Sequence, residues 1–192
     1  EDPFVNPTDT TIYYFQVSDA TGCYSNVDST VVIVKLKPKV DAGPDKEICD
    51  SPTAPGTFLD GGLAANNTAP GPYSYSWFPG GAAGGMIAGQ DSLVSPYVRP
   101  VQTTIYTLVV TSANGCSSDV TTLDTMSTVT VVVNPLPNVN AGPYSEICFG
   151  ETIQMNGSAN SAGPNYAYQW TPPTGLVNPA SPTSLNTPPA TT

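Results

Sequence analysis

The residues with the most reactive chemistry are four cysteines, Cys23, Cys49, Cys116 and Cys148, in a chain without histidine. Ser-His-Asp and Cys-His arrangements need histidine, so nucleophilic catalysis of those kinds is excluded. No Cys-x-x-Cys pair is present, which leaves little support for a zinc site. No pair of carboxylates falls in an aromatic segment of the kind that hydrolyses glycosides. We therefore expect no enzymatic activity, and thiols that either form disulfides or stay free.

Composition indicates where such a chain works. The net charge of the 192 residues is −10, and only 10% of residues are charged. A chain this acidic lacks the cationic surface that binds phosphate backbones, so we expect no nucleic-acid partner. It also lacks a basic patch for anionic membranes and any long apolar run, so we expect no direct membrane insertion. A surface rich in Ser, Thr, Asn, Gln and Gly is commoner in secreted proteins and predicts an extracellular or cell-surface location.

The sequence repeats itself. Residues 38–49, PKVDAGPDKEIC, match residues 137–148, PNVNAGPYSEIC, at an offset of 99. Residues 103–116, TTIYTLVVTSANGC, match residues 10–23, TTIYYFQVSDATGC, at an offset of 93. The two offsets together equal the 192 residues of the chain. The C-terminal segment therefore repeats the first half of a unit, and the N-terminal segment repeats its second half.

This repeat predicts one complete domain and two complementary half-domains. Residues 1–37 form the C-terminal part of a domain, residues 38–136 a complete domain, and residues 137–192 the N-terminal part of a domain. A half-domain alone would expose half a core and an unpaired sheet edge. We therefore expect neighbouring copies of the sequence to complete each half.

Alternating apolar and polar residues predict β-strands and almost no helix. Tyr73, Tyr75 and Trp77 alternate with serines, and YAYQW at 166–170 repeats this pattern. Asn-Gly in ANGC, residues 113–116, is a strong hairpin signal, because both residues tolerate positive φ. Short strands at this spacing predict an all-β fold of tandem seven-strand β-sandwiches. The expected core aromatic residues are Trp77, Trp170, Tyr106 and Tyr13.

DAGPDKEIC, YSYSWFPGG and TTIYTLVVTSANGC, with a closing valine strand, resemble the PKD/immunoglobulin-like repeats of Bacteroidota cell-surface proteins. These include gliding-motility-type adhesins exported by the type 9 system. The resemblance covers the middle domain and, in joined order, both half-domains; the glycine-rich WFPGGAAGGM at 77–86 departs from it. It implies secretion, an immunoglobulin-like sandwich and a stalk or adhesive role without enzymatic activity.

In such a sandwich Cys49 lies near the start of the second strand and Cys116 at the hairpin of the last two strands. We predict a disulfide between Cys49 and Cys116, and the equivalent bond between Cys148 and Cys23 of an adjacent copy. An oxidising, extracellular compartment favours both bonds. The alternative is that Cys23 and Cys148 are buried or reduced.

Three acids, Asp41, Asp45 and Glu47, lie at the entry of the middle domain, where calcium could stiffen a rod of domains through oxygen ligands. Only part of this set is repeated, because the counterparts are Asn140, Tyr144 and Glu146. The three acids are therefore weak calcium candidates, with solvated turn residues as the alternative. No other cofactor is expected.

Asp followed by Ser or Thr and then a small or aliphatic residue is the O-glycosylation pattern associated with these bacteria. It occurs four times, and we predict sugars on some of the hydroxyls of Thr10, Ser29, Ser92 and Thr125. Ordinary Ser/Thr-rich strand surface is the alternative explanation.

The sequence thus predicts a structural repeat unit of an extracellular filament or adhesin stalk. Its partners are adjacent copies of itself, joined head to tail in an open, linear assembly. The copies form either a covalent tandem repeat or separate subunits that complete one another by strand addition. The alternative function is a carbohydrate-binding accessory module of a secreted surface protein, with the aromatic side chains of the two YxYxW strands as a glycan platform. Their strict alternation favours core positions instead.

Overall fold

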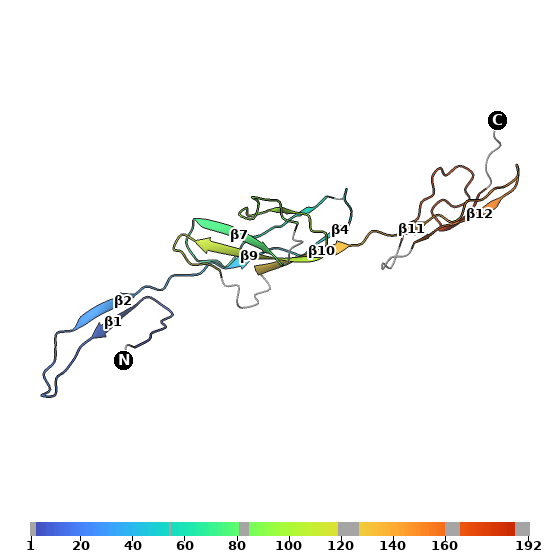
Figure 1. Cartoon of the computed structure of the whole chain (residues 1–192). Helices are drawn as coiled ribbons and strands as arrows, with labels where there is room; N and C mark the ends of the chain where they lie inside the picture. Colours follow the sequence, from blue (N-terminus) through green and yellow to red (C-terminus); the bar gives the residue numbers. More distant parts are fainter. Residues whose placement is uncertain (1–2, 54, 81–84, 119–126, 160–165, 187–192) are drawn as a thin grey trace. The chain divides into compact units, whose positions relative to one another are not determined.

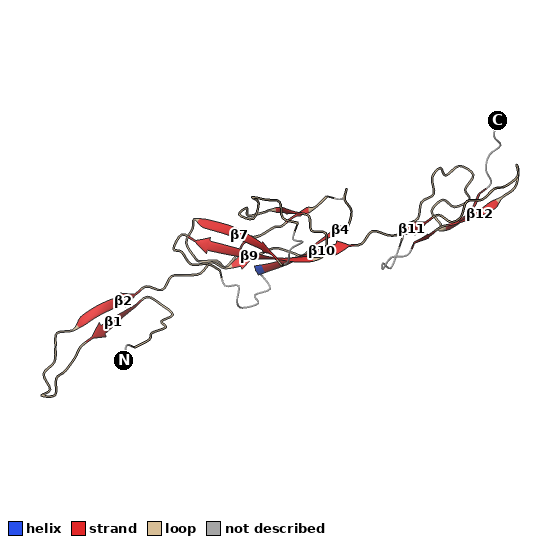
Figure 2. Ribbon diagram, in the orientation of Figure 1, coloured by secondary structure: helices blue, strands red, loops and turns tan. Residues whose placement is uncertain are grey.

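The structure is a computed structural model that describes residues 3–53, 55–80, 85–118, 127–159 and 166–186. These residues form β-strands in small sheets (Figures 1 and 2), which confirms the predicted all-β class. Within these ranges no helix is long and apolar enough to cross a membrane. The chain divides into two compact units, Glu1–Lys46 with Gly56–Val132, and Glu47–Pro55 with Val133–Thr192.

The strands are short, and most belong to the middle domain. In chain order they are β1 (Thr11–Phe15), β2 (Asp28–Val32), β3 (Val40–Asp41), β4 (Lys46–Cys49), β5 (Thr57–Phe58), β6 (Gly62–Leu63), β7 (Tyr73–Pro79), β8 (Tyr97–Val98), β9 (Thr104–Ser112), β10 (Thr128–Asn134), β11 (Val139–Asn140), β12 (Ile153–Asn156), β13 (Ser158–Ala159) and β14 (Thr183–Asn186).

The largest sheet has four strands in the order β4-β10-β9-β7. β9 is antiparallel to both of its neighbours, with Trp77 opposite Leu108 on one side and Val129 opposite Tyr106 on the other. Every second residue of β9 is buried, as the two-residue period of a strand with one covered face requires. β9 is therefore the central strand of the middle domain.

The core of the middle domain lies against this sheet. Its fully buried side chains include Trp77, Tyr106, Leu59, Leu108, Val98, Val110, Val129 and Val131. The Trp77 indole N–H donates to the Leu93 carbonyl at 3.0 Å, so its polar atom has a partner inside the fold. Burial of side chains of this size stabilises a fold by about 1.5–3 kcal/mol each.

The sequence predicts seven strands for this domain, whereas its described residues contain eight, β3 to β10. The Ala-Gly-Pro turn separates β3, which pairs with β6, from β4, which joins the four-stranded sheet. Gly43 has a φ of 81°, a conformation that residues with a Cβ rarely adopt, and its N–H donates to Asp41 Oδ1 at 2.9 Å. Cys49, expected near the start of the second strand, is the last residue of β4.

The two terminal segments form two-stranded sheets of their own. β1 and β2 form an antiparallel hairpin from Thr11↔Val32 to Phe15↔Asp28. In the C-terminal segment β11 pairs with β13, and β12 pairs with β14. Their described strands form no sheet of more than two strands. Their side chains are therefore covered on fewer sides than those of the middle domain.

Gly61 lies where a side chain would strike the core, because a Cβ there would overlap the Trp77 indole. We expect Gly61→Ala to lower the free energy of unfolding of the middle domain by about 1–3 kcal/mol or more, since overpacking displaces a buried ring. Gly62→Ala is the matched control, because nothing lies within 4 Å of its Cβ position. Urea unfolding measures both variants, and equal destabilisation would contradict the packing described.

Burial raises the pKa of Tyr106 to about 12 from its ordinary value of 10.0. The folded state then holds this proton more tightly than the unfolded state, so the stabilisation is complete below pH 10 and is lost as the pH rises toward 12. We expect the middle domain to lose on the order of 1–2 kcal/mol more between pH 9 and pH 11.5 than a Tyr106→Phe variant does. Denaturant midpoints at the two pH values measure this, and identical losses would contradict it.

Candidate assembly surfaces on the terminal segments

The N-terminal segment reproduces the hairpin that follows β9 in the middle domain. Asp19 N–H donates to the Cys23 carbonyl at 3.0 Å. Its counterpart, Ser112 N–H, donates to the Cys116 carbonyl at the same distance of 3.0 Å. Each turn contains a glycine of positive φ, 87° in the first and 82° in the second. The repeat at an offset of 93 therefore extends from sequence to backbone geometry.

β1 and its counterpart β9 differ in what covers them. Phe15 is 69% exposed, whereas its counterpart Leu108 is fully buried. The outward residue Ile12 does not differ in this way, because it is 51% exposed and its counterpart Ile105 is 52% exposed, whereas outward Tyr14 is more exposed than its half-buried counterpart Thr107. The N-terminal hairpin thus exposes the face that the middle domain buries as its core.

This exposed face carries a hollow of about 430 Å³. Its lining includes four residues that repeat core positions, namely Tyr13, Phe15, Thr30 and Val32, together with neighbours that do not, among them Tyr14 and Ser29. The counterparts of the first four in the middle domain are at most 1% exposed, and these are Tyr106, Leu108, Val129 and Val131. Tyr13 itself is half-buried. The hollow is therefore lined in part by uncovered core positions.

The C-terminal segment reproduces the first half of the middle domain in the same way. The Trp170 indole N–H donates to the Ser181 carbonyl at 2.9 Å, as the Trp77 indole does to a backbone carbonyl at 3.0 Å. Gly157 lies against the Trp170 ring as Gly61 lies against the Trp77 ring. β11 pairs with β13 as β3 pairs with β6.

This segment also exposes residues whose counterparts are core. Val139 is 73% exposed, whereas its counterpart Val40 is 7% exposed. Met155 is half-buried, whereas Leu59, which precedes Gly61 as Met155 precedes Gly157, is fully buried. These positions of the C-terminal segment are therefore less covered than their counterparts in the middle domain.

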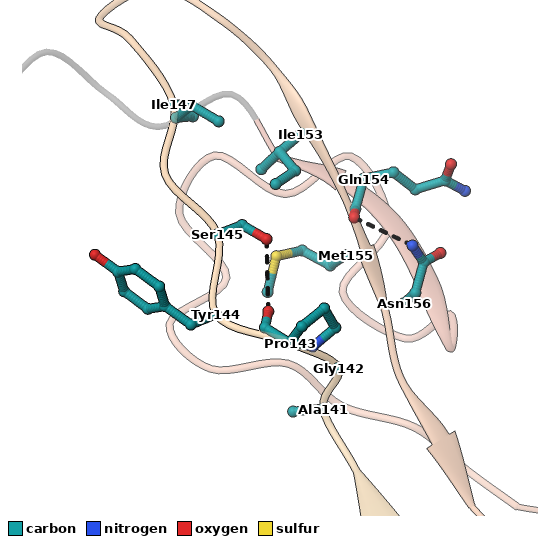
Figure 3. Close-up of a pocket in the computed structure, with 10 residues that line it drawn as sticks. All are labelled: Ala141, Gly142, Pro143, Tyr144, Ser145, Ile147, Ile153, Gln154, Met155 and Asn156. Atoms are coloured by element: carbon teal, nitrogen blue, oxygen red, sulfur yellow. Dashed lines mark hydrogen bonds between the residues drawn. The ribbon is translucent and has the colours of Figure 1, made fainter.

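Figure 3 shows the hollow that results, about 430 Å³ in volume, between residues 141–147 and β12. Ile153 and Met155 point from β12 into it, whereas Gln154 points away. Ser145 Oγ, on the facing stretch, donates to the carbonyl of its near neighbour Pro143 at 3.5 Å. The apolar residues that alternate along β12 therefore line an open space.

The strand edges of the terminal segments, like their apolar faces, differ from those of the middle domain. β9 pairs with both β7 and β10, whereas β1 pairs with β2 alone among the strands that the structure describes. The counterpart of β7 in the C-terminal segment, residues 166–172, is not a strand. β7 and β9 are neighbours in the middle domain, and their counterparts, residues 166–172 and β1, belong to different terminal segments.

The predicted disulfide between Cys49 and Cys116 is not formed, and all four cysteines are free thiols. Cys116 follows the C-terminal end of β9, where its carbonyl accepts the Ser112 N–H. Cys49 ends β4, and the next residue, Asp50, donates its N–H at 2.8 Å to Asn134, the last residue of β10. Because β9 and β10 are antiparallel, the two cysteines lie at opposite ends of the sheet. The nine-residue strand β9 that separates them is roughly 25–30 Å long, whereas the Cα atoms of two disulfide-bonded cysteines lie about 5.5 Å apart.

The three calcium candidates are not brought together either. The carboxylate of Asp45 accepts the Thr130 N–H at 2.7 Å, and that of Glu47 accepts the side-chain amide of Asn134 at 3.3 Å. Asp41 caps the Gly43 turn. Within the described ranges no group of three or more His, Cys, Asp or Glu side chains could hold a metal ion. These acids hydrogen-bond to strands and turns separately, so the calcium prediction has no support in the geometry.

Three of the four predicted glycosylation positions, Thr10, Ser29 and Ser92, are exposed. Thr125 lies outside the described residues. Exposure allows an enzyme to reach a hydroxyl but does not select it, so glycosylation stays a prediction.

The aromatic side chains considered for glycan binding are engaged within the fold. The Tyr73 hydroxyl accepts the side-chain amide of Asn67 at 3.1 Å, and Trp77 is 2% exposed. The rings of Tyr166 and Tyr168 meet edge to face with centroids 6.4 Å apart. The described residues of these two stretches therefore form no flat, exposed platform.

Sequence reasoning missed the residues that hold the two cysteine hairpins. Asp19 accepts the Thr21 hydroxyl at 2.7 Å and the Cys23 N–H at 2.9 Å, and these bonds lower the pKa of its carboxyl. In the middle domain Asn114 Oδ1 accepts the Cys116 N–H at 3.1 Å. An Asp or Asn shortly before a cysteine in a Gly-containing turn is a signal that could have found them.

Comparison with known proteins gives a likeness to solved structures that is limited in extent. No family model matches the chain, and no curated protein matches it. Among solved structures the chain is similar to the solution structure of the PKD domain from KIAA 1837 protein, with 26% sequence identity and a TM-score of 0.37. The match covers 59% of this chain and 98% of that chain. It is a structural match to one PKD domain over part of the chain and assigns the chain to no family.

Trp77 and Trp170 are the only tryptophans, and they report separately on the two versions of the same core. Trp77 is buried, whereas Trp170 is half-buried. Each tryptophan can be observed alone, Trp170 in a Trp77→Phe variant and Trp77 in a Trp170→Phe variant. In dilute solutions of the monomeric chain we expect acrylamide to quench the fluorescence of Trp170 several-fold more strongly than that of Trp77. Equal quenching of the two variants would show that the C-terminal half-core is already covered.

Proposed function

We propose that the chain is the structural repeat unit of an extracellular filament or adhesin stalk that assembles head to tail. Residues 137–192 of one copy and residues 1–37 of the next copy form one shared domain. The same contact serves a covalent tandem repeat and a row of separate subunits. The work of the assembly is mechanical, namely to span distance and to resist unfolding and proteolysis.

The observation that carries this function is the exposure, on the terminal segments, of positions that are core in the middle domain. Phe15 and Val139 are exposed where Leu108 and Val40 are buried, while the outward residue Ile12 keeps the exposure of its counterpart Ile105. Exposed apolar surface of this kind is unfavourable in water and favours association. The sequence that would cover each half-core is present in the other terminal segment.

Pairing in the middle domain defines the register expected in the shared domain. Trp77 lies opposite Leu108 across β7 and β9. By the repeat, Trp170 of one copy is expected opposite Phe15 of the next. Strand addition in this register would supply backbone hydrogen bonds along the free edge of β1 and side chains for both hollows.

Assembly through these surfaces is open-ended. The contact joins the C-terminal segment of one copy to the N-terminal segment of another, and a heterologous contact that does not close produces a filament. The linkers VKLKPKV (34–40) and VNPLPNV (133–139) contain proline, which fixes φ and favours extended backbone. Successive domains would therefore be held at a regular spacing.

An extracellular setting fits the composition of the surface. Only 10% of residues are charged, and the chain is acidic and rich in Ser and Thr. The exposed hydroxyls of Thr10, Ser29 and Ser92 are available for sugars. We include O-glycosylation of these positions in the proposed function.

Two residues of β1 distinguish strand addition from non-specific apolar association. Phe15 and Ile12 are both exposed, at 69% and 51%, but only Phe15 repeats a core position, that of Leu108. We expect Phe15→Thr to weaken self-association at least about 30-fold, because it removes a side chain that becomes buried. Ile12→Thr is the matched control, because Ile12 does not line the hollow and is as exposed as its counterpart Ile105, so it should change self-association less than about threefold.

Sedimentation and light scattering over a concentration series measure the association, and negative-stain electron microscopy detects filaments. The middle domain does not contain β1, so its thermal unfolding should be unchanged in both variants. Wild-type chain that stays a compact monomer at every concentration would refute the function. Equal weakening by the two variants would refute the register.

A further inference from the structure

The linker that enters the middle domain lies beside a cysteine. Cys116 Sγ is 3.9 Å from the carbonyl oxygen of Lys35. Lys35 Nζ donates to the Asn114 carbonyl at 2.9 Å, and the side-chain amide of Asn114 donates to the Leu36 carbonyl at 3.2 Å. The last hairpin of the middle domain is thus tied to the linker that precedes it.

The linker that leaves the middle domain lies beside a different cysteine. Asp50, the residue after Cys49, donates its N–H to the Asn134 carbonyl at 2.8 Å. Glu47, on the same strand, accepts the side-chain amide of Asn134 at 3.3 Å. Asn134 is the counterpart of Lys35 at the offset of 99. The two cysteines of one domain therefore lie at successive joints, each beside an equivalent linker carbonyl.

When the contacts of one linker are transferred to the equivalent linker by the sequence repeat, two cysteines are expected at each linker. At Asn134, Cys49 is already present, and Cys23 of the following copy occupies the place that Cys116 has beside Lys35. The hairpins of Cys23 and Cys116 have the same backbone hydrogen bond at 3.0 Å, which supports this placement, while the side chains of Asn114 and Lys35 that hold the linker have Thr21 and Asn134 as counterparts. A carbonyl oxygen has two lone pairs and accommodates both neighbours.

Two cysteines are expected at Lys35 as well, one from the same copy and one from the preceding copy. Cys116 is already present, and Cys148 of the preceding copy, the counterpart of Cys49, ends the stretch 145–148, which would add to β2 as β4 pairs with β10. The residue after it, Phe149, would donate its N–H to the Lys35 carbonyl, as Asp50 does to the counterpart carbonyl.

We propose that disulfides cross the joints between domains. Cys49 pairs with Cys23 of the following copy, and Cys148 pairs with Cys116 of the following copy. This pairing rests on the proposed head-to-tail assembly and replaces the two bonds expected from the sequence. Two bonds then link each pair of consecutive copies, one on either side of the shared domain, and the filament becomes covalent along its length.

Each bond joins two thiol sulfurs, which lose two protons and two electrons. The electrons pass to the disulfide of an oxidant by thiol–disulfide exchange, and that disulfide is reduced to two thiols. Cys23, Cys49 and Cys148 are exposed and Cys116 is partly exposed, so an oxidant reaches all four. None is a core residue, as a cysteine that bridged the interior of a sandwich would be.

The competing arrangement places the bonds within domains. Cys49 and Cys116 lie at opposite ends of the four-stranded sheet. Cys148 and Cys23 of the following copy hold the equivalent positions in the shared domain, so the same separation applies to them. Pairing across the joints removes this conflict without moving any strand.

Two double variants distinguish the arrangements. Filaments of the full chain are oxidised with glutathione disulfide, free thiols are blocked with N-ethylmaleimide, and the samples are run on a denaturing gel without reductant. Oxidised wild type should give a ladder in steps of 19.9 kDa. Cys49→Ser with Cys116→Ser removes one member of each joint pair, so the ladder should collapse to monomer.

Cys49→Ser with Cys23→Ser is the matched control, because it removes both members of one bond and leaves Cys148 with Cys116 to sustain the ladder. Bonds within domains give the opposite result, with a ladder in the first variant and monomer in the second, and would overturn the pairing. Filaments with only monomer on the oxidised wild-type gel would also overturn it and leave the proposed function standing. Absence of filaments in reductant and in oxidant would refute the proposed function itself.

Discussion

The structure depends on one constraint, namely that the apolar face of a β-sheet must be covered. In the middle domain β9 satisfies it completely, because β7 and β10 pair with both of its edges and its inward side chains are buried. β1 carries the same pattern but has one strand neighbour in the described part of the chain, and Phe15 remains exposed. In the C-terminal segment, likewise, Val139 is exposed where its counterpart Val40 is buried.

Both terminal segments nevertheless keep part of the local geometry of the middle domain. The Trp–Gly contact and the indole hydrogen bond occur in the middle domain and again around Trp170. The Asx-held hairpin occurs at Cys116 and again at Cys23. Residues 166–172, the counterpart of β7, are by contrast not a strand. The local structure around the tryptophan and in the hairpin therefore follows from the repeated sequence.

The joints between domains are built from specific contacts in addition to proline. Lys35 and Leu36 both hydrogen-bond with Asn114, so the linker is fastened to the hairpin of the domain that it enters. At the exit, Asn134 is bonded to both Glu47 and Asp50. In the proposed stalk, force would pass through these linkers, and the proposed disulfides would lie where domains would otherwise separate.

The sequence by itself determined the all-β class, the repeat offsets, the hairpin turns and the alternation around Trp77 and Tyr106, because each depends on a local period or on neighbouring residues. It predicted seven strands where eight occur, and which sheet β3 and β4 each join, on either side of Gly43, depends on non-local pairing. Only the tertiary structure decided where Cys49 and the acids Asp45 and Glu47 lie. Strand order and direction come from non-local pairing, which brings residues far apart in the chain together at one end of a sheet and separates others that the spacing alone would match.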